Sequence, residues 1–181
     1  MNTENKAEKH YSFVFMGVSG SGKSAVAETV ARETNAPFLD GDFLHPRANI
    51  NKMASGQPLD DNDRAPWLET VNSAIYAMQN THRISILVCS ALKQKYRNKL
   101  RENNPNLYFI YLKGDPELIS KRLQSRKGHF FKPAMLKSQF DALEEPTNNH
   151  NDICYIDISK TLNEVVEDAL AFINKIVMSS K

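Results

Sequence analysis

The residues with the clearest chemical meaning form a glycine-rich loop near the N-terminus. Residues 17–24 fit the spacing G-x-x-x-x-G-K-[ST], between an apolar run typical of a strand and a helical pattern. Such glycines let successive backbone N–H groups point at a phosphate, and the N-terminus of the next helix favours its negative charge. We expect Lys23 to reach the β- and γ-phosphates of a nucleotide and Ser24 to bind Mg²⁺. The predicted nucleotide-binding residues here are Gly17, Val18, Ser19, Gly20, Ser21, Gly22, Lys23 and Ser24.

The glycine-rich loop has two alternatives to a kinase loop. A glycine-rich turn that only joins strand to helix explains the glycines, but not the lysine followed by serine. GTPases carry D-x-x-G and N-K-x-D motifs; the first is absent, and Asn51-Lys52-Met53-Ala54 lacks the aspartate of the second. Motor and transporter ATPases need longer chains. The loop therefore favours a small kinase.

A pair of carboxylates follows the second expected strand. Asp40 and Asp42 are two residues apart, and such side chains alternate in direction if the backbone is extended. One is expected to face the water shell of Mg²⁺, and the other to accept or orient the proton of an acceptor hydroxyl. The alternative is a pair of solvated turn carboxylates, which the neighbouring phosphate loop makes less attractive.

Donors and acceptors for a second substrate are concentrated between residues 45 and 66 and after the third expected strand. This density suits a polyol, and Arg64 suits a carboxylate through two parallel hydrogen bonds. Lys93, Arg97 and Arg101 share one helical face. The alternatives are a solvated loop that caps the helix beginning near Arg64, with its aspartates favourable there, and a solvated basic face.

A basic segment beginning at Arg122 predicts a lid. Arg122 and Arg126 are one helical turn apart, and His129 follows a glycine. Kinases close positive charge over the transferred phosphoryl group and exclude water from it. The alternatives are a basic helix end that complements the helix dipole and, for His129, simple packing beside two phenylalanines.

The elements that must position these residues alternate along the chain. Strands are expected at residues 13–16, 37–39, 84–89, 107–112 and 153–158, with helical patterns between and after them. This alternation predicts an α/β fold, in which a five-stranded parallel sheet has helices on both faces. Ligands of such folds bind beyond the carboxyl ends of the strands, where the residues above are found.

Composition narrows the class of protein. The chain of 181 residues suits one domain, 1–181, and its net charge of +2 gives no reason to expect nucleic acid or a membrane surface as partner. Cys89 and Cys154 lie in apolar runs and are expected to be core residues. No signal peptide or membrane-spanning run is seen, so a cytoplasmic protein is expected.

The chain resembles the gluconokinases, small phosphate-loop kinases related to shikimate and nucleoside monophosphate kinases. The resemblance runs from about Tyr11 to Ile176. The pieces that carry it are residues 16–24, Asp40-Gly41-Asp42 with His45-Pro46, residues 52–59, Pro66-Trp67-Leu68, Cys89-Ser90-Ala91-Leu92-Lys93, residues 126–130 and Ser138-Gln139-Phe140. Ala25 departs from a frequent threonine, and Asn62 from a frequent acidic residue.

The resemblance implies a phosphate-loop kinase fold, ATP with Mg²⁺, gluconate as acceptor and 6-phosphogluconate as product. It also implies a homodimer, an acceptor-binding segment at about residues 42–80 and a lid at about residues 122–143. It assigns Asp42, Arg64 and the His45 region to the acceptor, Asp40 to the surroundings of the metal, and Arg126 to the lid. Together with the motifs above, the expected catalytic residues are Lys23, Asp42 and Arg126, the nucleotide residues beyond the loop are Arg122 and Arg126, and the metal residues are Ser24 and Asp40. The expected acceptor residues are Asp42, His45, Arg64, Ser90, Lys93, Arg97 and His129.

Two rival functions remain open at this point. One is a kinase for another acceptor, such as shikimate or a nucleoside monophosphate, although no pocket for an acceptor base is identified. The other is a non-catalytic ATP-binding sensor, which the loss of Lys23, Asp42 or the lid arginines would favour; all are present.

Overall fold

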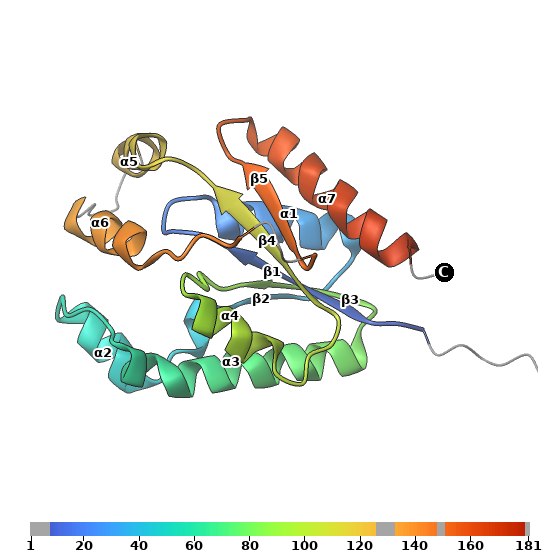
Figure 1. The fold of residues 1–181 in the computed structure, drawn as a ribbon, viewed down its shortest axis with the longest axis horizontal. Coiled ribbons are helices and arrows are strands. Elements are labelled where there is room, and N and C mark those ends of the chain that lie inside the picture. The colour runs from blue at the N-terminus through green and yellow to red at the C-terminus, as the bar shows by residue number, and fades with distance from the viewer. Residues whose placement is uncertain (1–7, 126–132, 148–150, 180–181) are drawn as a thin grey trace, which may run out of the picture.

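The computed structural model describes residues 8–125, 133–147 and 151–179 (Figure 1). Strands and helices alternate along these ranges. The strands are β1 (Tyr11–Met16), β2 (Phe38–Asp40), β3 (Ile84–Val88), β4 (Leu107–Lys113) and β5 (Ile153–Asp157). The helices are α1 (Lys23–Thr34), the 3₁₀ helix η1 (Gly41–Leu44), α2 (Arg47–Ala54), α3 (Asp61–Thr81), α4 (Gln94–Arg101), α5 (Pro116–Ser125), α6 (Pro133–Ala142) and α7 (Leu162–Met178).

The strands form one parallel sheet in the order β2-β3-β1-β4-β5. In the centre, Phe13 of β1 is level with Ile86 of β3 and Tyr108 of β4. The predicted five-stranded parallel α/β fold is therefore confirmed. Because strand order reverses direction around β1, the loop after β1 lies at the topological switch point where such folds bind ligands.

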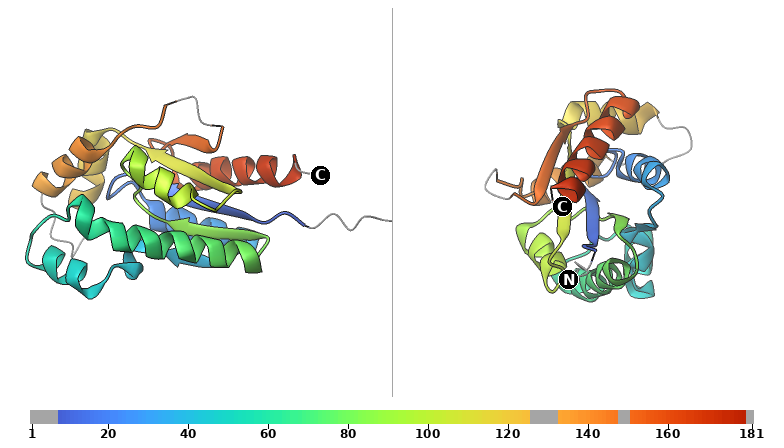
Figure 2. Two further views of the ribbon diagram at one scale, coloured as in Figure 1. Left: turned by 60° about the horizontal axis from the view of Figure 1, so that its bottom comes forward. Right: turned by 90° about the vertical axis from the view of Figure 1, so that its right-hand side faces the viewer.

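Both faces of the sheet are buried, each under its own helices (Figures 1 and 2). Phe13 and Phe15 belong to a core cluster shared with α1 and α7, whereas Val14 and Met16 belong to a second cluster shared with α3 and α4. Successive side chains of a strand point to opposite faces, so a strand buried on both sides must be continuously apolar. That requirement explains why β1, β3 and β4 have so few polar residues.

Three helices, η1, α2 and α3, follow β2 in the segment proposed to bind the acceptor. Asp60 caps α3: its side chain accepts from the backbone N–H of Asp63, and the Asp63 side chain accepts in return from the backbone of Asp60. The capping role considered for these aspartates is thus confirmed. The helix α2 lies within the segment expected to be a donor-rich loop, and η1 follows β2 directly.

Gly41 allows η1 to begin against the sheet. A Cβ atom at this position would lie 2.7 Å from the carbonyl oxygen of Val88, at the end of the neighbouring strand. Since real Cβ atoms do not approach so closely, a side chain here would push η1 away from β3. Gly41 therefore fixes the position of the adjacent Asp40 and Asp42.

No helix in the described part of the chain is long and apolar enough to span a membrane.

The two cysteines match their expected setting only in part. Cys89 is fully buried, and burial raises the pKa of its thiol to about 12, whereas Cys154 is half-buried against the cluster under α7. Both are free thiols.

Candidate active site

The loop between β1 and α1 holds its own lysine and serine in place. Lys23 Nζ donates to the carbonyl oxygen of Val18 at 3.0 Å, across the loop, and the Ser24 hydroxyl donates to Asp40 Oδ2 at 3.0 Å. The backbone N–H of Ser19 donates to Gln139 Oε1 of α6 at 3.0 Å. The predicted phosphate loop is therefore a formed loop at the end of β1, in contact with both Asp40 and α6.

Gly20 is a residue of this loop that lies close to Leu123 of α5. Its φ is +82°, a conformation that favours glycine, and an added Cβ would lie 2.7 Å from Cγ of Leu123. Any side chain at this position would be strained and would displace Leu123. The loop is thus contacted from α5 through Leu123 and from α6 through Gln139.

Asp40 and Asp42 have distinct settings, although Asp42 lies in η1 and not in the extended backbone on which their predicted alternation depended. Asp40 accepts from Ser24 through Oδ2 and from the backbone N–H of Asp42 through Oδ1. Asp42 keeps contact with water, yet the protein around it raises the pKa of its carboxyl by burial, and Asp40 adds to the rise. The nearby charges of Lys23 and His45 act in the opposite direction. Asp42 is therefore close enough to both Lys23 and His45 to be affected by their charges.

His45 is held flat against the acceptor-side helix. Its ring stacks on Trp67 with centroids 4.2 Å apart and an interplanar angle of 16°, and its Nδ1 lies 3.2 Å from Asn49 Nδ2. Trp67 Nε1 donates to the carbonyl oxygen of Gly41 at 2.7 Å. Burial lowers the pKa of His45, with Arg64 contributing against the opposing effect of Asp42. His45 is therefore a neutral hydrogen-bonding group at pH 7.

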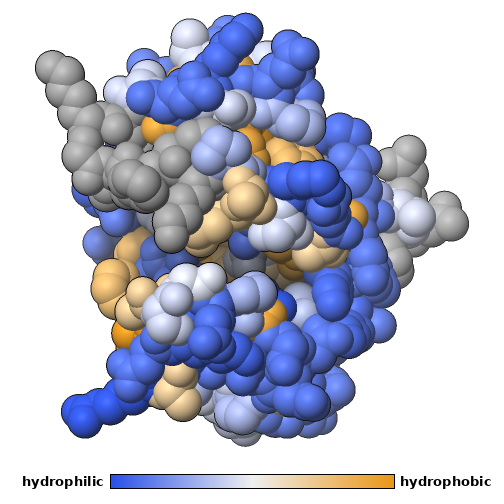
Figure 3. All heavy atoms as spheres, turned by 90° about the vertical axis from the view of Figure 1, so that its left-hand side faces the viewer, coloured by the Kyte–Doolittle hydropathy of each residue, from blue (hydrophilic) through white to orange (hydrophobic). Residues whose placement is uncertain are grey.

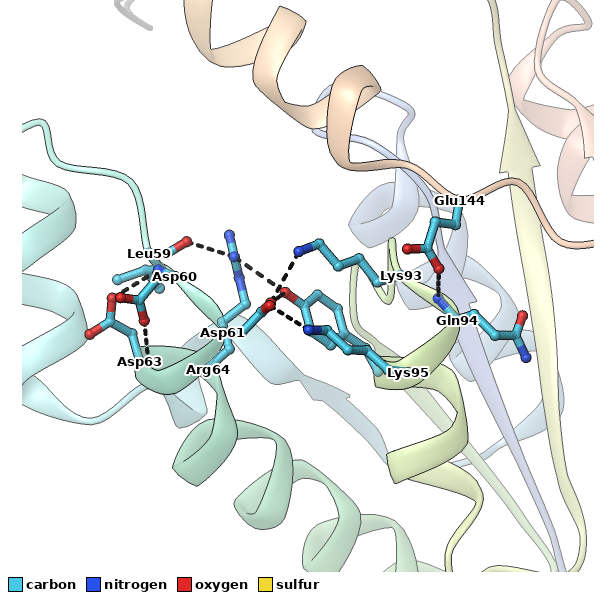
Figure 4. A network of polar contacts seen from close by, with 10 residues as sticks. Leu59, Asp60, Asp61, Asp63, Arg64, Lys93, Gln94, Lys95 and Glu144 are labelled. Atoms are coloured by element: carbon cyan, nitrogen blue, oxygen red, sulfur yellow. Dashed lines mark hydrogen bonds and ion pairs between the residues drawn. The ribbon is translucent and has the colours of Figure 1, made fainter.

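Arg64 and Lys93 meet across the gap between α3 and α4 (Figure 4). Arg64 Nη1 donates to the carbonyl oxygen of Leu59 at 2.6 Å and to the Tyr96 hydroxyl at 3.4 Å. Lys93 Nζ donates to Asp61 Oδ1 at 3.1 Å, and the Tyr96 hydroxyl donates to the same oxygen. The structure thus brings two of the predicted acceptor residues together through Asp61 and Tyr96.

Arg97 is not placed as a substrate ligand, which corrects the expectation. Its side chain is fully buried and donates to the carbonyl oxygens of Ala91, Leu92 and Glu144. Ala91 has a φ of +45°, which is unusual for a residue with a side chain. Arg97 therefore acts as an internal brace for the turn that carries Ser90 and Lys93. The Ser90 carbonyl accepts from the N–H of Gly17 at 3.2 Å, which joins this turn to the phosphate loop.

The predicted lid is covered only in part by the described residues. Arg122 is half-buried and its guanidinium donates to the carbonyl oxygen of Ile158, after β5. Arg126 and His129 lie outside the described residues. On the face seen in Figure 3, the molecule is hollowed between α2 on one side and α5 with α6 on the other. This hollow lies at the carboxyl edge of the sheet, where the loop after β1 and the residues after β2 are found.

The oxygen atoms beside the phosphate loop fit Mg²⁺. Ser24 and Asp40 present a hydroxyl and a carboxylate 3.0 Å apart, and both are hard ligands of the kind that Mg²⁺ prefers. Within the described ranges, no group of three or more histidine, cysteine or acidic side chains could hold a metal. Kinase sites need no such cage, because Mg²⁺ there keeps waters and binds phosphate oxygens.

Four residues of this region carried no functional assignment from the sequence: Asp61, Trp67, Tyr96 and Gln139. Trp67 of α3 packs in the core and also stacks on His45. Asp61 appeared as one of several aspartates near a helix start, and nothing in the sequence links it to Lys93, 32 residues away. Only the pairing of α3 with α4 could have identified it.

Comparisons with known proteins show which family this chain resembles. The shikimate kinase family model matches residues 19–177. A thermoresistant gluconokinase of Escherichia coli (strain K12) is 57% identical over 175 residues, which cover 97% of this chain and 99% of that protein. A thermosensitive gluconokinase of the same organism is 49% identical over 156 residues, covering 86% and 83%. A crystal structure of a gluconokinase from Sinorhizobium meliloti 1021 superposes with a TM-score of 0.84 at 39% identity, covering 93% of this chain and 94% of that one.

Proposed function

The chain belongs to the gluconokinase family, and from that membership we propose that it transfers the γ-phosphoryl group of ATP to gluconate, giving 6-phosphogluconate and ADP. The observation that carries the proposal is the meeting of two sets of groups at one edge of the sheet. The phosphate loop supplies Lys23 and Ser24, and Ser24 donates to Asp40 beside Asp42. His45 stacks on Trp67 of α3, the helix that also carries Arg64.

The donor half of the reaction falls to the loop after β1. Its backbone N–H groups and Lys23 would hold the β- and γ-phosphates, and Ser24 with Asp40 would hold Mg²⁺. The metal would neutralise charge on the phosphate oxygens. Arg122 and Arg126 are proposed to add positive charge from the lid side, where Arg122 must leave the Ile158 carbonyl to do so.

The acceptor half falls to Asp42 and the groups beyond it. The acceptor hydroxyl oxygen forms a bond to the γ-phosphorus as the bond to the β–γ bridging oxygen breaks, and ADP leaves. Asp42 orients the hydroxyl and receives its proton. Because phosphoryl transfer passes through a loose transition state, orientation matters more than basicity.

The carboxylate end of gluconate would lie away from the phosphate loop. Arg64 acts electrostatically on both His45 and Tyr96, and Lys93 also acts on Tyr96. Arg64 and Lys93 both lie beside the Tyr96 ring, and His45 stacks on Trp67 of the same helix as Arg64. From these neighbours we infer the order Asp42, His45, Arg64 and Lys93. A sugar acid extended along them presents its terminal hydroxyl to Asp42 and its carboxylate to the two cations. Ser90 and His129 are proposed as further acceptor contacts.

The remaining proposals concern the whole chain. We propose one kinase domain over residues 1–181, with an acceptor-binding segment at about 42–80 and a lid at about 122–143. A homodimer acting in the cytoplasm, without nucleic-acid or membrane partners, completes the proposal. Its support is the near-neutral charge and the match to relatives over nearly their full length.

The test is ADP release from Mg-ATP with a panel of acceptors: gluconate, glucose, shikimate and AMP. We expect turnover with gluconate and at most weak turnover with the others, and phosphorus NMR should identify a phosphate ester on the sugar acid. Equal or better turnover with shikimate or AMP would replace the acceptor while keeping the kinase. ATP binding without turnover on any acceptor would favour the sensor.

A further inference from the structure

Asp61 is shared by three donors from the start of α4 (Figure 4). Oδ1 accepts from Lys93 Nζ at 3.1 Å and from the Tyr96 hydroxyl, and Oδ2 accepts from Lys95 Nζ. These contacts hold the pKa of the Asp61 carboxyl well below its usual range, with Lys95 and Tyr96 as the first causes. Asp61 is therefore a permanent negative charge in contact with a proposed acceptor residue.

Tyr96 gathers three cations around its ring. Lys93 Nζ, Arg64 Cζ and Lys95 Nζ lie 5.6, 5.8 and 5.9 Å from the ring centroid. All three distances are within the range of cation–π attraction. Three positive charges and the one negative charge of Asp61 thus lie around a single aromatic ring.

The four charged groups differ in how open they are to water. The side chain of Lys95 is 58% exposed and that of Asp61 is 42% exposed, whereas that of Lys93 is 27% exposed. Lys95 therefore lies on the outer side of the group, and Lys93 is the more enclosed of the two lysines. A change at Lys95 alters the local charge without removing a proposed acceptor contact.

We propose that Asp61 is a specificity-determining residue that sets the charge of the acceptor site, by offsetting one of the three cations so that the site suits a substrate with a single carboxylate. This inference rests on the proposed function, since the acceptor is the gluconate monoanion. Asp61 does not touch the acceptor. It competes with the acceptor carboxylate for Lys93. Affinity for the acceptor should therefore rise as the net charge around Tyr96 becomes more positive.

The test is a series of variants in which only this charge changes. Asp61→Asn removes the negative charge and is expected to lower the KM for gluconate roughly two- to fivefold. Lys95→Met removes one positive charge and should raise that KM by a similar factor. The double variant restores the wild-type net charge, and its KM should return close to the wild-type value. We expect kcat and the KM for ATP to change little throughout.

The dependence of KM on salt concentration is a second measurement. It would not change if Asp61 had only a structural role. Exposed charges are screened by salt, so the KM differences between variants should shrink as salt is raised. A higher KM for gluconate in Asp61→Asn would overturn the inference, because it would identify Asp61 only as an anchor for the lysines. Equal KM values across the series would overturn it too. Wild-type protein that does not phosphorylate gluconate would instead defeat the proposed function.

Discussion

At the residue scale, the proposed proton acceptor is Asp42, whose carboxyl keeps contact with water while the surrounding protein disfavours its charge. Burial and Asp40 raise its pKa, and Lys23 and His45 oppose them. A carboxylate in this setting holds a proton more readily than a free one does, which suits a group that receives a proton during transfer.

This direction gives a pH prediction for the Asp42→Asn variant. Protonated Asp42 cannot accept the hydroxyl proton, so wild-type kcat/KM for gluconate should fall on the acidic side with a midpoint above about 3.9, the ordinary value for aspartate. Asp42→Asn should lower kcat by about 10²- to 10⁴-fold and lose this acidic limb. Asp141→Asn, an exposed change on α6, is the matched control and should keep the limb.

Stability separates loss of chemistry from loss of fold in this test. The folded state raises the pKa of Asp42, so the ionised form opposes folding, and this penalty is present once the pH rises above the folded-state pKa. Asp42→Asn should therefore unfold at the same or a higher urea concentration than wild type at pH 7. An acidic limb that persists in the variant would show that another group controls it.

At the element scale, Arg97 holds three segments together. It joins α4 to the Ala91 turn and to Glu144, which follows α6. Glu144 is tied in again, since its N–H donates to the Leu92 carbonyl at 2.9 Å and its side chain accepts from the N–H of Gln94 at 2.7 Å. The turn that presents Lys93 is therefore positioned by α4 and by the segment after α6 together.

Arg97→Met should consequently destabilise the protein. It leaves the carbonyl groups of Ala91 and Glu144 without the guanidinium donor, whereas Leu92 keeps the N–H of Glu144. Because buried polar groups left unpaired cost about 1–3 kcal/mol each, we expect a total loss of about 2 kcal/mol or more. Urea unfolding measures it. Arg101→Met, which breaks a half-exposed pair with Asp152, is the control and should cost less. Unchanged stability with a large rise in gluconate KM would return Arg97 to the acceptor site.

The sequence predicts the elements better than their contacts. The strands are continuously apolar and the phosphate loop is a local pattern, so both can be recognised from neighbouring residues. The part played by Arg97 cannot, because helical spacing placed it on a shared face with Lys93 while the fold turns it inward under the Ala91 turn. Likewise, the stacking of His45 on Trp67 joins residues from separate elements. Such contacts depend on how helices pack, which spacing along one helix does not specify.

At the scale of the whole molecule, both halves of the site depend on one sheet. Its two faces support separate core clusters, and the loops after β1, β2 and β3 all leave from the same edge. The phosphate loop and the turn of Ser90 are joined by a backbone hydrogen bond at that edge. Ligands bound there should therefore stabilise the protein as a single cooperative unit.

Thermal unfolding should report the two ligands separately. Mg-ATP at about 100 times its Kd adds about 2.7 kcal/mol, which for a domain of this size raises Tm by roughly 5–10 °C. Lys23→Met should remove most of the ATP shift while keeping the shift produced by gluconate. An ATP shift that survives this substitution would place the nucleotide elsewhere than the loop after β1, and loss of both shifts would indicate a damaged fold.

The contact between Ser19 and Gln139 has one more consequence. The backbone N–H of Ser19, which the loop would offer to a phosphate oxygen, already donates to the side-chain amide oxygen of Gln139. Gln139 thus occupies the place of a phosphate oxygen. A bound nucleotide would then replace the hydrogen bond from Ser19 to Gln139 with one from Ser19 to a phosphate oxygen. The exchange favours the phosphate, because an ionised acceptor makes the stronger hydrogen bond. The exchange would release Gln139 of α6, the helix that leads through Glu144 to the turn that carries Lys93.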